Sequence, residues 1–107
     1  MTNVKVYSNL RNYTLSEHEK SVDDLPFKWQ TLNNVPSDAV KYGYQAVLIY
    51  AYIHSGIVYS LNPFFDKWDS GIAGVLLFPA NAKNVRLKSK NFVNKLNKAE
   101  EGDDADY

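Results

Sequence analysis

Residues 45–80, QAVLIYAYIHSGIVYSLNPFFDKWDSGIAGVLLFPA, hold a dense concentration of aliphatic residues. Apart from His54, their ionisable charges are Asp66, Lys67 and Asp69, which fall together in one short segment. Apolar runs rich in β-branched and aromatic residues lie on both sides of that segment, and such runs are typical of strands. The stretch therefore predicts a β-hairpin over residues 46–61, a charged aromatic loop and a third strand over residues 74–78.

The first strand of this hairpin is apolar from Ala46 to Ile53, which predicts that both of its faces are covered. Ser55 and Gly56 suit a two-residue turn, because glycine adopts positive φ without strain. That register would pair Tyr52 with Tyr59, so Tyr50, Tyr52 and Tyr59 would share one face of the sheet.

The two flanking regions complete the predicted sheet and cover it. Residues 4–7 alternate as a short edge strand does, and an edge strand could pair with a second copy to form a homodimer. Ser16 and Glu19 have the spacing of a helix capping box. The closing Pro36 predicts an extended or looped segment over residues 26–36.

After Pro79, apolar residues at Val85, Phe92 and Leu96 recur with helical spacing, which predicts a helix within residues 81–99. Its cap would be Asn81 or Ser89. The fold class expected from these elements is α+β. It is a small antiparallel sheet of three to five strands, with a C-terminal helix packed on one face.

The chain totals limit the function classes. A length of 107 residues predicts one domain, over residues 1–99, followed by a disordered acidic tail over residues 100–107. With no net charge, the chain as a whole does not attract nucleic acid or an anionic membrane. It has no cysteine and no apolar run long enough to span a bilayer, which favours a cytoplasmic protein.

Charge is nevertheless unevenly distributed near the C-terminus. Residues 83–98 carry six basic residues and no acidic one, and residues 100–106 carry five acidic residues and no basic one. The basic segment could contact a phosphate backbone, so nucleic-acid binding is one alternative function. Its contact residues would be Lys83, Arg86, Lys88, Lys90 and Lys95, with Lys98 at the end of the same run.

A second alternative is a small hydrolase, because His54, Asp69 and Ser70 are the residue types of a Ser-His-acid arrangement. The residues that follow Ser70 lead into a strand, whereas a nucleophile elbow leads into a helix. A simpler interpretation is that Asp69 and Ser70 form a side-chain-stabilised turn in which Gly71 and Gly74 supply positive φ or tight packing. No metal-ligand spacing or cofactor motif is present, so neither a metal nor a cofactor is expected.

The aromatic content favours a binding function. Aromatic residues make up 14% of the chain, and exposed tyrosine and tryptophan are common in protein interfaces. The residues predicted to contact a protein partner are Tyr50, Tyr52, Tyr59, Phe65 and Trp68.

The central stretch contains two motifs. The first is an H-S-G turn, and the second is P-F followed by W-D-S-G-x-x-G leading into a strand. Together they resemble motifs of small, mostly uncharacterised bacteriophage accessory proteins. The matching residues are His54, Ser55, Gly56, Pro63, Phe64, Trp68, Asp69, Ser70, Gly71 and Gly74. The resemblance covers about a third of the chain, and it implies a viral origin and action in the host cytoplasm.

The function predicted from these observations is non-enzymatic protein binding. The resemblance implies a phage-encoded inhibitor of a bacterial host or antiviral-defence protein, of the anti-CRISPR or anti-restriction type. The shared motifs could then be either a binding site or a folding signature.

Overall fold

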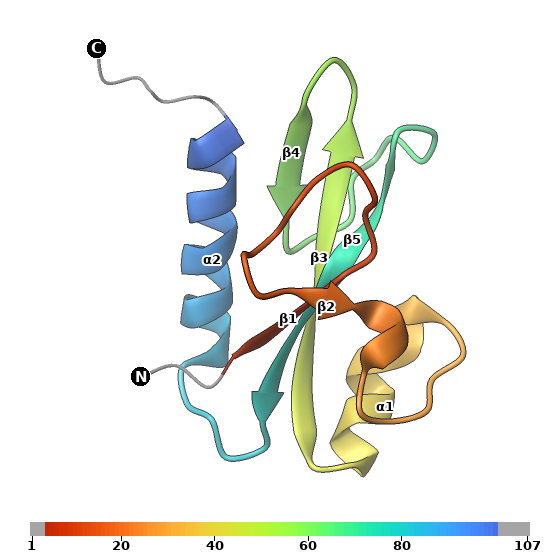
Figure 1. The fold of residues 1–107 in the computed structure, drawn as a ribbon, viewed down its shortest axis with the longest axis vertical. Coiled ribbons are helices and arrows are strands. Elements are labelled where there is room, and N and C mark those ends of the chain that lie inside the picture. The colour runs from red at the N-terminus through yellow and green to blue at the C-terminus, as the bar shows by residue number, and fades with distance from the viewer. Residues whose placement is uncertain (1–3, 101–107) are drawn as a thin grey trace.

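The computed structural model describes residues 4–100 and contains one sheet of five strands in the order β2-β1-β5-β3-β4 (Figure 1). Neighbouring strands run antiparallel except β1 and β2, which are parallel. The strands are β1 (Lys5–Ser8), β2 (Lys20–Ser21), β3 (Tyr44–Ile53), β4 (Ile57–Ser60) and β5 (Ser70–Pro79). The helices are α1 (Val35–Lys41) and α2 (Val85–Glu100), with short 3₁₀ turns η1 (Val22–Asp24) and η2 (Leu32–Asn34). The α+β class and the C-terminal helix on one face of the sheet are confirmed.

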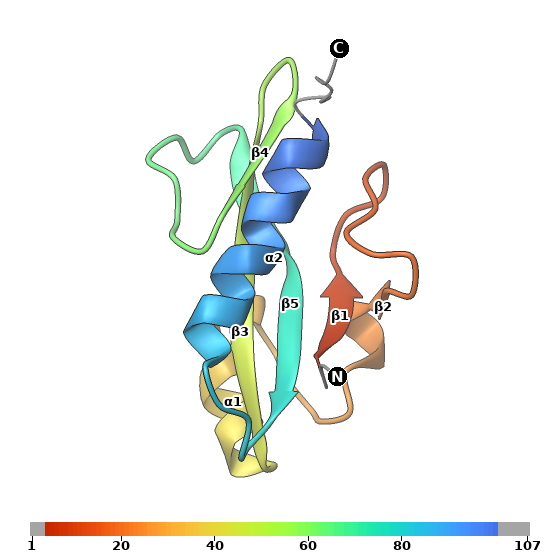
Figure 2. The ribbon, with the colours of Figure 1, turned by 90° about the vertical axis from the view of Figure 1, so that its left-hand side faces the viewer.

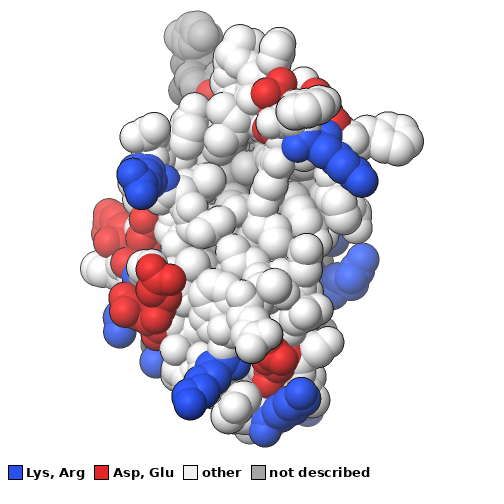
Figure 3. All heavy atoms as spheres, turned by 90° about the vertical axis from the view of Figure 1, so that its right-hand side faces the viewer, with Lys and Arg blue, Asp and Glu red and all other residues white. Residues whose placement is uncertain are grey.

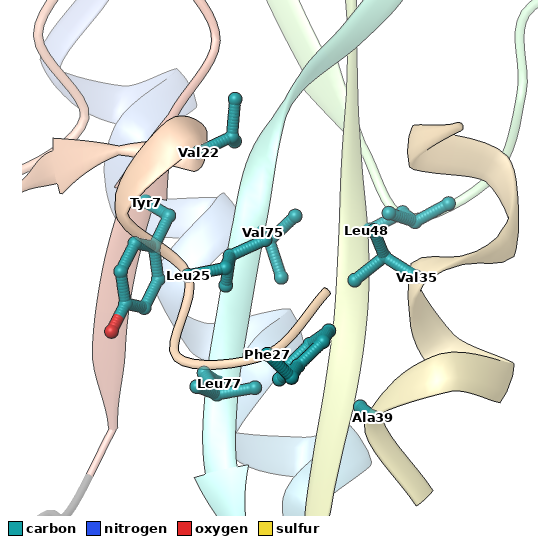
Figure 4. Close-up of a cluster of buried hydrophobic side chains, with 9 residues drawn as sticks. All are labelled: Tyr7, Val22, Leu25, Phe27, Val35, Ala39, Leu48, Val75 and Leu77. Carbon is teal, nitrogen blue, oxygen red and sulfur yellow. The ribbon is translucent and has the colours of Figure 1, made fainter. Parts of the chain in front are cut away.

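The two faces of the sheet bury separate apolar clusters, because both β3 and β5 are covered on each side. One face is covered by α2 (Figure 2). This helix packs on the sheet through Val93 and the partly buried Phe92 and Leu96. On the other face, α1 and the segment after η1 cover β3 and β5 (Figure 4). Figure 4 shows this second cluster, which consists of Tyr7, Val22, Leu25, Phe27, Val35, Ala39, Leu48, Val75 and Leu77.

The hairpin forms, but its predicted register is wrong by one residue. Ile53 pairs with Ile57 and Ala51 pairs with Tyr59, so the loop contains His54, Ser55 and Gly56. Ser55 takes a φ of 56°, in the left-handed region. Because side chains alternate along a strand, this shift moves Tyr59 to the face opposite Tyr52.

The C-terminal helix begins at Val85, and neither predicted cap lies at its start. Asn81 lies outside the helix, and Ser89 lies inside it, fully buried. The Ser89 hydroxyl donates to the Val85 carbonyl at 2.8 Å, a local bond that lets serine occupy a helix interior. The predicted strand at residues 74–78 is the second half of the longer β5.

The region before β3 differs from its predicted structure in two places. Ser16 and Glu19 do make capping-box bonds, with the Glu19 carboxylate accepting from the Leu15 and Ser16 N–H groups at 2.7 and 3.3 Å. They close a turn, and β2 follows it without a helix. Pro36 lies in the first turn of α1, where its missing N–H has no helical partner to lose.

The ends of the chain set the limits of this description. Glu100, predicted to start the acidic tail, is the last residue of α2, and the rest of the predicted tail lies outside the described residues. Within residues 4–100, no helix is both long enough and apolar enough to cross a bilayer.

Candidate functional site

The loop over residues 61–69 joins β4 to β5 and is fastened to itself by hydrogen bonds. The Asp66 carboxylate accepts from the Trp68 and Asp69 N–H groups at 2.8 and 3.3 Å, which forms an Asx turn. The Ser70 hydroxyl donates to the Asp66 carbonyl. The turn-forming carboxylate is therefore Asp66, in place of the predicted Asp69.

Asp69 connects this loop to the end of β3. Its carbonyl accepts from the Ile53 N–H at 2.7 Å, and its carboxylate lies 3.2 Å from Nδ1 of His54. Tyr52 stacks against His54, with ring centroids 6.1 Å apart, and is 5.7 Å from the ring of Phe64. The loop is thus held against the hairpin by both backbone and side-chain contacts.

The three residues of the hydrolase hypothesis do not form a connected triad. His54 and Asp69 are paired, as that hypothesis requires, but the Ser70 hydroxyl donates to the Asp66 carbonyl. A nucleophilic serine needs its hydroxyl bonded to the histidine base. The Ser70 hydroxyl therefore stabilises the 61–69 loop in this structure.

Two aromatic side chains of this loop project from the molecule. Phe65 and Trp68 have relative exposures of 102% and 95%. Val58, which pairs with Tyr52 across the hairpin, is 49% exposed. We call Tyr52, Val58, Phe64, Phe65 and Trp68 together the aromatic surface. Figure 3 views the molecule from the side opposite α2, where charged side chains gather around the rim and leave the middle uncharged.

The tyrosines predicted to bind a partner are divided between the two faces of the sheet. Tyr50 and Tyr52 are partly buried on the side of the 61–69 loop. Tyr59 is 2% exposed and packs in the cluster beneath α2, so its prediction as an exposed contact residue is wrong. Burial raises the pKa of Tyr59 to about 12, with the charge of Glu100 adding to the shift.

The two glycines of the W-D-S-G-x-x-G motif have different structural roles. A Cβ on Gly74 would lie 2.4 Å from the Tyr7 carbonyl oxygen and 2.7 Å from Cδ1 of Leu15. Gly74 therefore lets β1 and the following loop approach β5 closely. Gly71 is exposed, and a Cβ there would meet no atom of residues 4–100 within 4 Å. Neither glycine has a positive φ, so that part of the interpretation is wrong.

The residues predicted to contact nucleic acid are all exposed, but they do not share one side of α2. Arg86 and Lys90 lie one turn apart and line a groove of about 320 Å³ between α2 and β4. With 3.6 residues per turn, Lys88 and Lys95 lie on the opposite side of the helix. Lys83 precedes the helix.

Asn97 is an important residue that sequence reasoning missed. Its side-chain amide accepts from the Tyr59 N–H at 2.8 Å and donates to the Tyr59 carbonyl at 3.0 Å. It thus occupies the outer edge of β4 as a neighbouring strand would. In the sequence Asn97 is one polar residue among the lysines of a helix, and only its position one turn after Val93 indicates the buried side.

Metal binding finds no support in the part of the chain that the structure describes. Residues 4–100 contain no group of three or more histidine, aspartate or glutamate side chains placed to hold an ion.

No protein-family model, curated protein or solved structure matches this chain.

Proposed function

We propose that this chain is a non-enzymatic protein-binding module that docks onto its partner through the aromatic surface. The observation that supports the proposal is the full exposure of Phe65 and Trp68 on a loop fastened by the Asp66 turn and the Asp69 contacts. Aromatic side chains are frequent interface hot spots, and burying one contributes roughly 1.5–3 kcal/mol. A loop already held in place loses less conformational entropy when it binds.

We further propose that the partner is a bacterial host or antiviral-defence protein, and that the chain acts as a phage-encoded inhibitor of the anti-CRISPR or anti-restriction type. The motif pair around His54 and Trp68 supports this narrower proposal. An inhibitor that acts by blocking another protein needs a contact surface and no catalytic activity. The aromatic surface provides such a contact surface.

The test compares the unaltered chain with Phe65→Ser/Trp68→Ser as bait in bacterial lysates, with quantitative mass spectrometry of the retained proteins. Leu87→Ser is the matched control, because Leu87 is 57% exposed and lies on α2, away from the loop. We expect one partner to be retained by the unaltered chain and by Leu87→Ser, and its affinity to fall at least about tenfold in the double variant. Equal retention by all three, or no specific partner, would contradict the proposal.

The narrower proposal has its own readout. The unaltered chain, expressed in a strain with an active CRISPR or restriction system, should restore plaque formation by a targeted phage, and Phe65→Ser/Trp68→Ser should not. The rival nucleic-acid function would instead appear as oligonucleotide binding through residues 83–98 that weakens steeply as salt rises.

A further inference from the structure

The two edge regions of the sheet differ in how their outward backbone groups are covered. At the β4 edge, the Asn97 amide occupies both backbone groups of Tyr59. At the other edge, β2 pairs with Tyr7 and Ser8 of β1. Within residues 4–100, no strand pairs with Lys5 and Val6 on the outer side of β1. Edge strands left open in this way can accept a strand from another chain.

A groove of about 400 Å³ runs along this open part of β1. One wall is apolar and reaches α2, and the other carries basic and polar side chains. The lining residues are Val4, Lys5, Val6, Tyr7, Ser16, His18, Lys20 and Phe92.

The backbone of β1 is oriented to use this groove. The Asn9 N–H donates to the Ala73 carbonyl at 2.8 Å, so the backbone groups of Asn9 face β5. Antiparallel pairing alternates along a strand, and those of Tyr7 and Lys5 therefore also face β5. The N–H and carbonyl groups of Val6 therefore face outward. The parallel register of Tyr7 with Lys20 uses the Val6 carbonyl for pairing with β2, so the Val6 N–H is the group left facing the groove.

We propose that this groove accepts an extended segment of another protein as an additional strand beside β1. Val4, Val6 and Phe92 pack against the cluster on the α2 face, so alternate side chains of the added strand that face α2 should be apolar. Lys5, like Tyr7, faces the opposite side, and Lys20 pairs with Tyr7 on that side. The intervening side chains of the added strand should therefore be acidic, which gives an alternating apolar and acidic segment.

Charge decides between this occupant and a second copy of the chain. Two β1 strands paired with each other would bring their Lys5 side chains near one another, and like charges across a strand pair are destabilising. Among residues 4–100, no acidic residue lines the groove. Lys88 and Lys95, one turn before and after Phe92 on α2, add positive charge beside it. His18, which also lines the groove, lies 3.7 Å from the Glu17 carboxylate.

The experiment uses a labelled peptide of alternating valine and glutamate as the probe, with a peptide of alternating valine and lysine as its counterpart. Binding to the full chain is measured by fluorescence anisotropy, and the contact is located from the amide NMR signals. We expect only the valine–glutamate peptide to bind and to shift the Val6 amide. Lys5→Glu/Lys20→Glu should weaken binding by about tenfold, because two attractive pairs become repulsive.

Two control variants keep the result specific. Lys28→Glu/Lys41→Glu makes the same charge change at two exposed lysines outside the groove and should leave peptide binding unchanged. Phe65→Ser/Trp68→Ser should also bind the peptide normally. A failure of this groove proposal can therefore be distinguished from a failure of the proposed function of the aromatic surface. The proposal is overturned if the valine–glutamate peptide does not bind. It is also overturned if the valine–lysine peptide binds equally well, if both lysine variants weaken binding alike, or if the shifted amides belong to β4.

Discussion

The two faces of the β3–β4 hairpin have similar apolar and aromatic composition and opposite roles. On one face, α2 covers Ile57 and Tyr59, which are 6% and 2% exposed. On the other face, Tyr52 and Val58 are covered only in part, and the 61–69 loop beside them exposes Phe65 and Trp68. Which tyrosine becomes core and which becomes surface is decided by the register of the hairpin, because a shift of one residue exchanges the two faces.

Energetics explain why the three-residue loop is preferred over the two-residue turn. Placing Ser55 in the left-handed region costs roughly 1–2 kcal/mol. Burying the side chains of Ile57 and Tyr59 beneath α2 contributes roughly 1.5–3 kcal/mol each. The Asn97 amide adds two hydrogen bonds to Tyr59 in this register. Burial therefore outweighs the strained loop.

The largest effect on the covered face is expected from Gly74→Ala. The new Cβ would overlap the Tyr7 carbonyl oxygen and the Leu15 side chain, so β1 must move away from β5. Overpacking of this kind costs about 1–3 kcal/mol, and we expect the upper end because one of the contacted atoms is backbone. Urea unfolding followed by circular dichroism measures the loss.

Gly71→Ala is the control for this change. It adds the same methyl group three residues away, where the new Cβ meets no atom of the described residues within 4 Å and the glycine has no positive φ. Its stability should stay within about 0.5 kcal/mol of the unaltered chain. Equal losses in the two variants would show that the close approach of β1 to Gly74 does not constrain the fold.

The sequence was sufficient for the fold class and insufficient for the hairpin register. The alternation of apolar residues in the sequence matches the two faces of β3, where Val47, Ile49 and Ala51 pack on one face and Leu48 and Tyr50 on the other. The turn was misjudged because Ser-Gly suits a two-residue turn locally, whereas the burial beneath α2 that overrides it is a long-range effect. The exposure of the loop aromatics Phe65 and Trp68 could be predicted from their charged neighbours. The burial of Tyr59 could not be predicted without knowing the register of the hairpin.

The next effect concerns the contact between α2 and the β4 edge. Asn97→Ala leaves the Tyr59 N–H and carbonyl without their side-chain partner and should lower the free energy of unfolding by about 1–2 kcal/mol. Asn94→Ala is the control, because Asn94 is exposed on the same helix. Both changes raise helix propensity equally, so the difference between them isolates the Tyr59 contact. Matching stabilities in a denaturant titration would mean that the amide pairing contributes nothing.

The smallest effect tests the buried phenol beneath α2. The Tyr59 hydroxyl is buried and has no hydrogen-bond partner within residues 4–100, so Tyr59→Phe should be neutral or stabilising by up to about 1 kcal/mol at pH 8. The difference should grow at alkaline pH. Burial raises the pKa of Tyr59 from 10.0 to about 12, so this group's contribution is complete below pH 10 and is lost as the pH rises toward 12.

Unfolding measured at pH 8, 10, 11 and 12 separates this contribution from that of Tyr7, whose pKa is also raised by burial and which both proteins retain. Tyr59→Phe should lose less stability than the unaltered chain between pH 10 and 12. Tyr42→Phe is the control, because Tyr42 is 53% exposed and should follow the unaltered chain. If Tyr59→Phe lowers the free energy of unfolding by more than about 1 kcal/mol at pH 8, the hydroxyl is hydrogen-bonded in solution. Water would then reach the face of the sheet beneath α2.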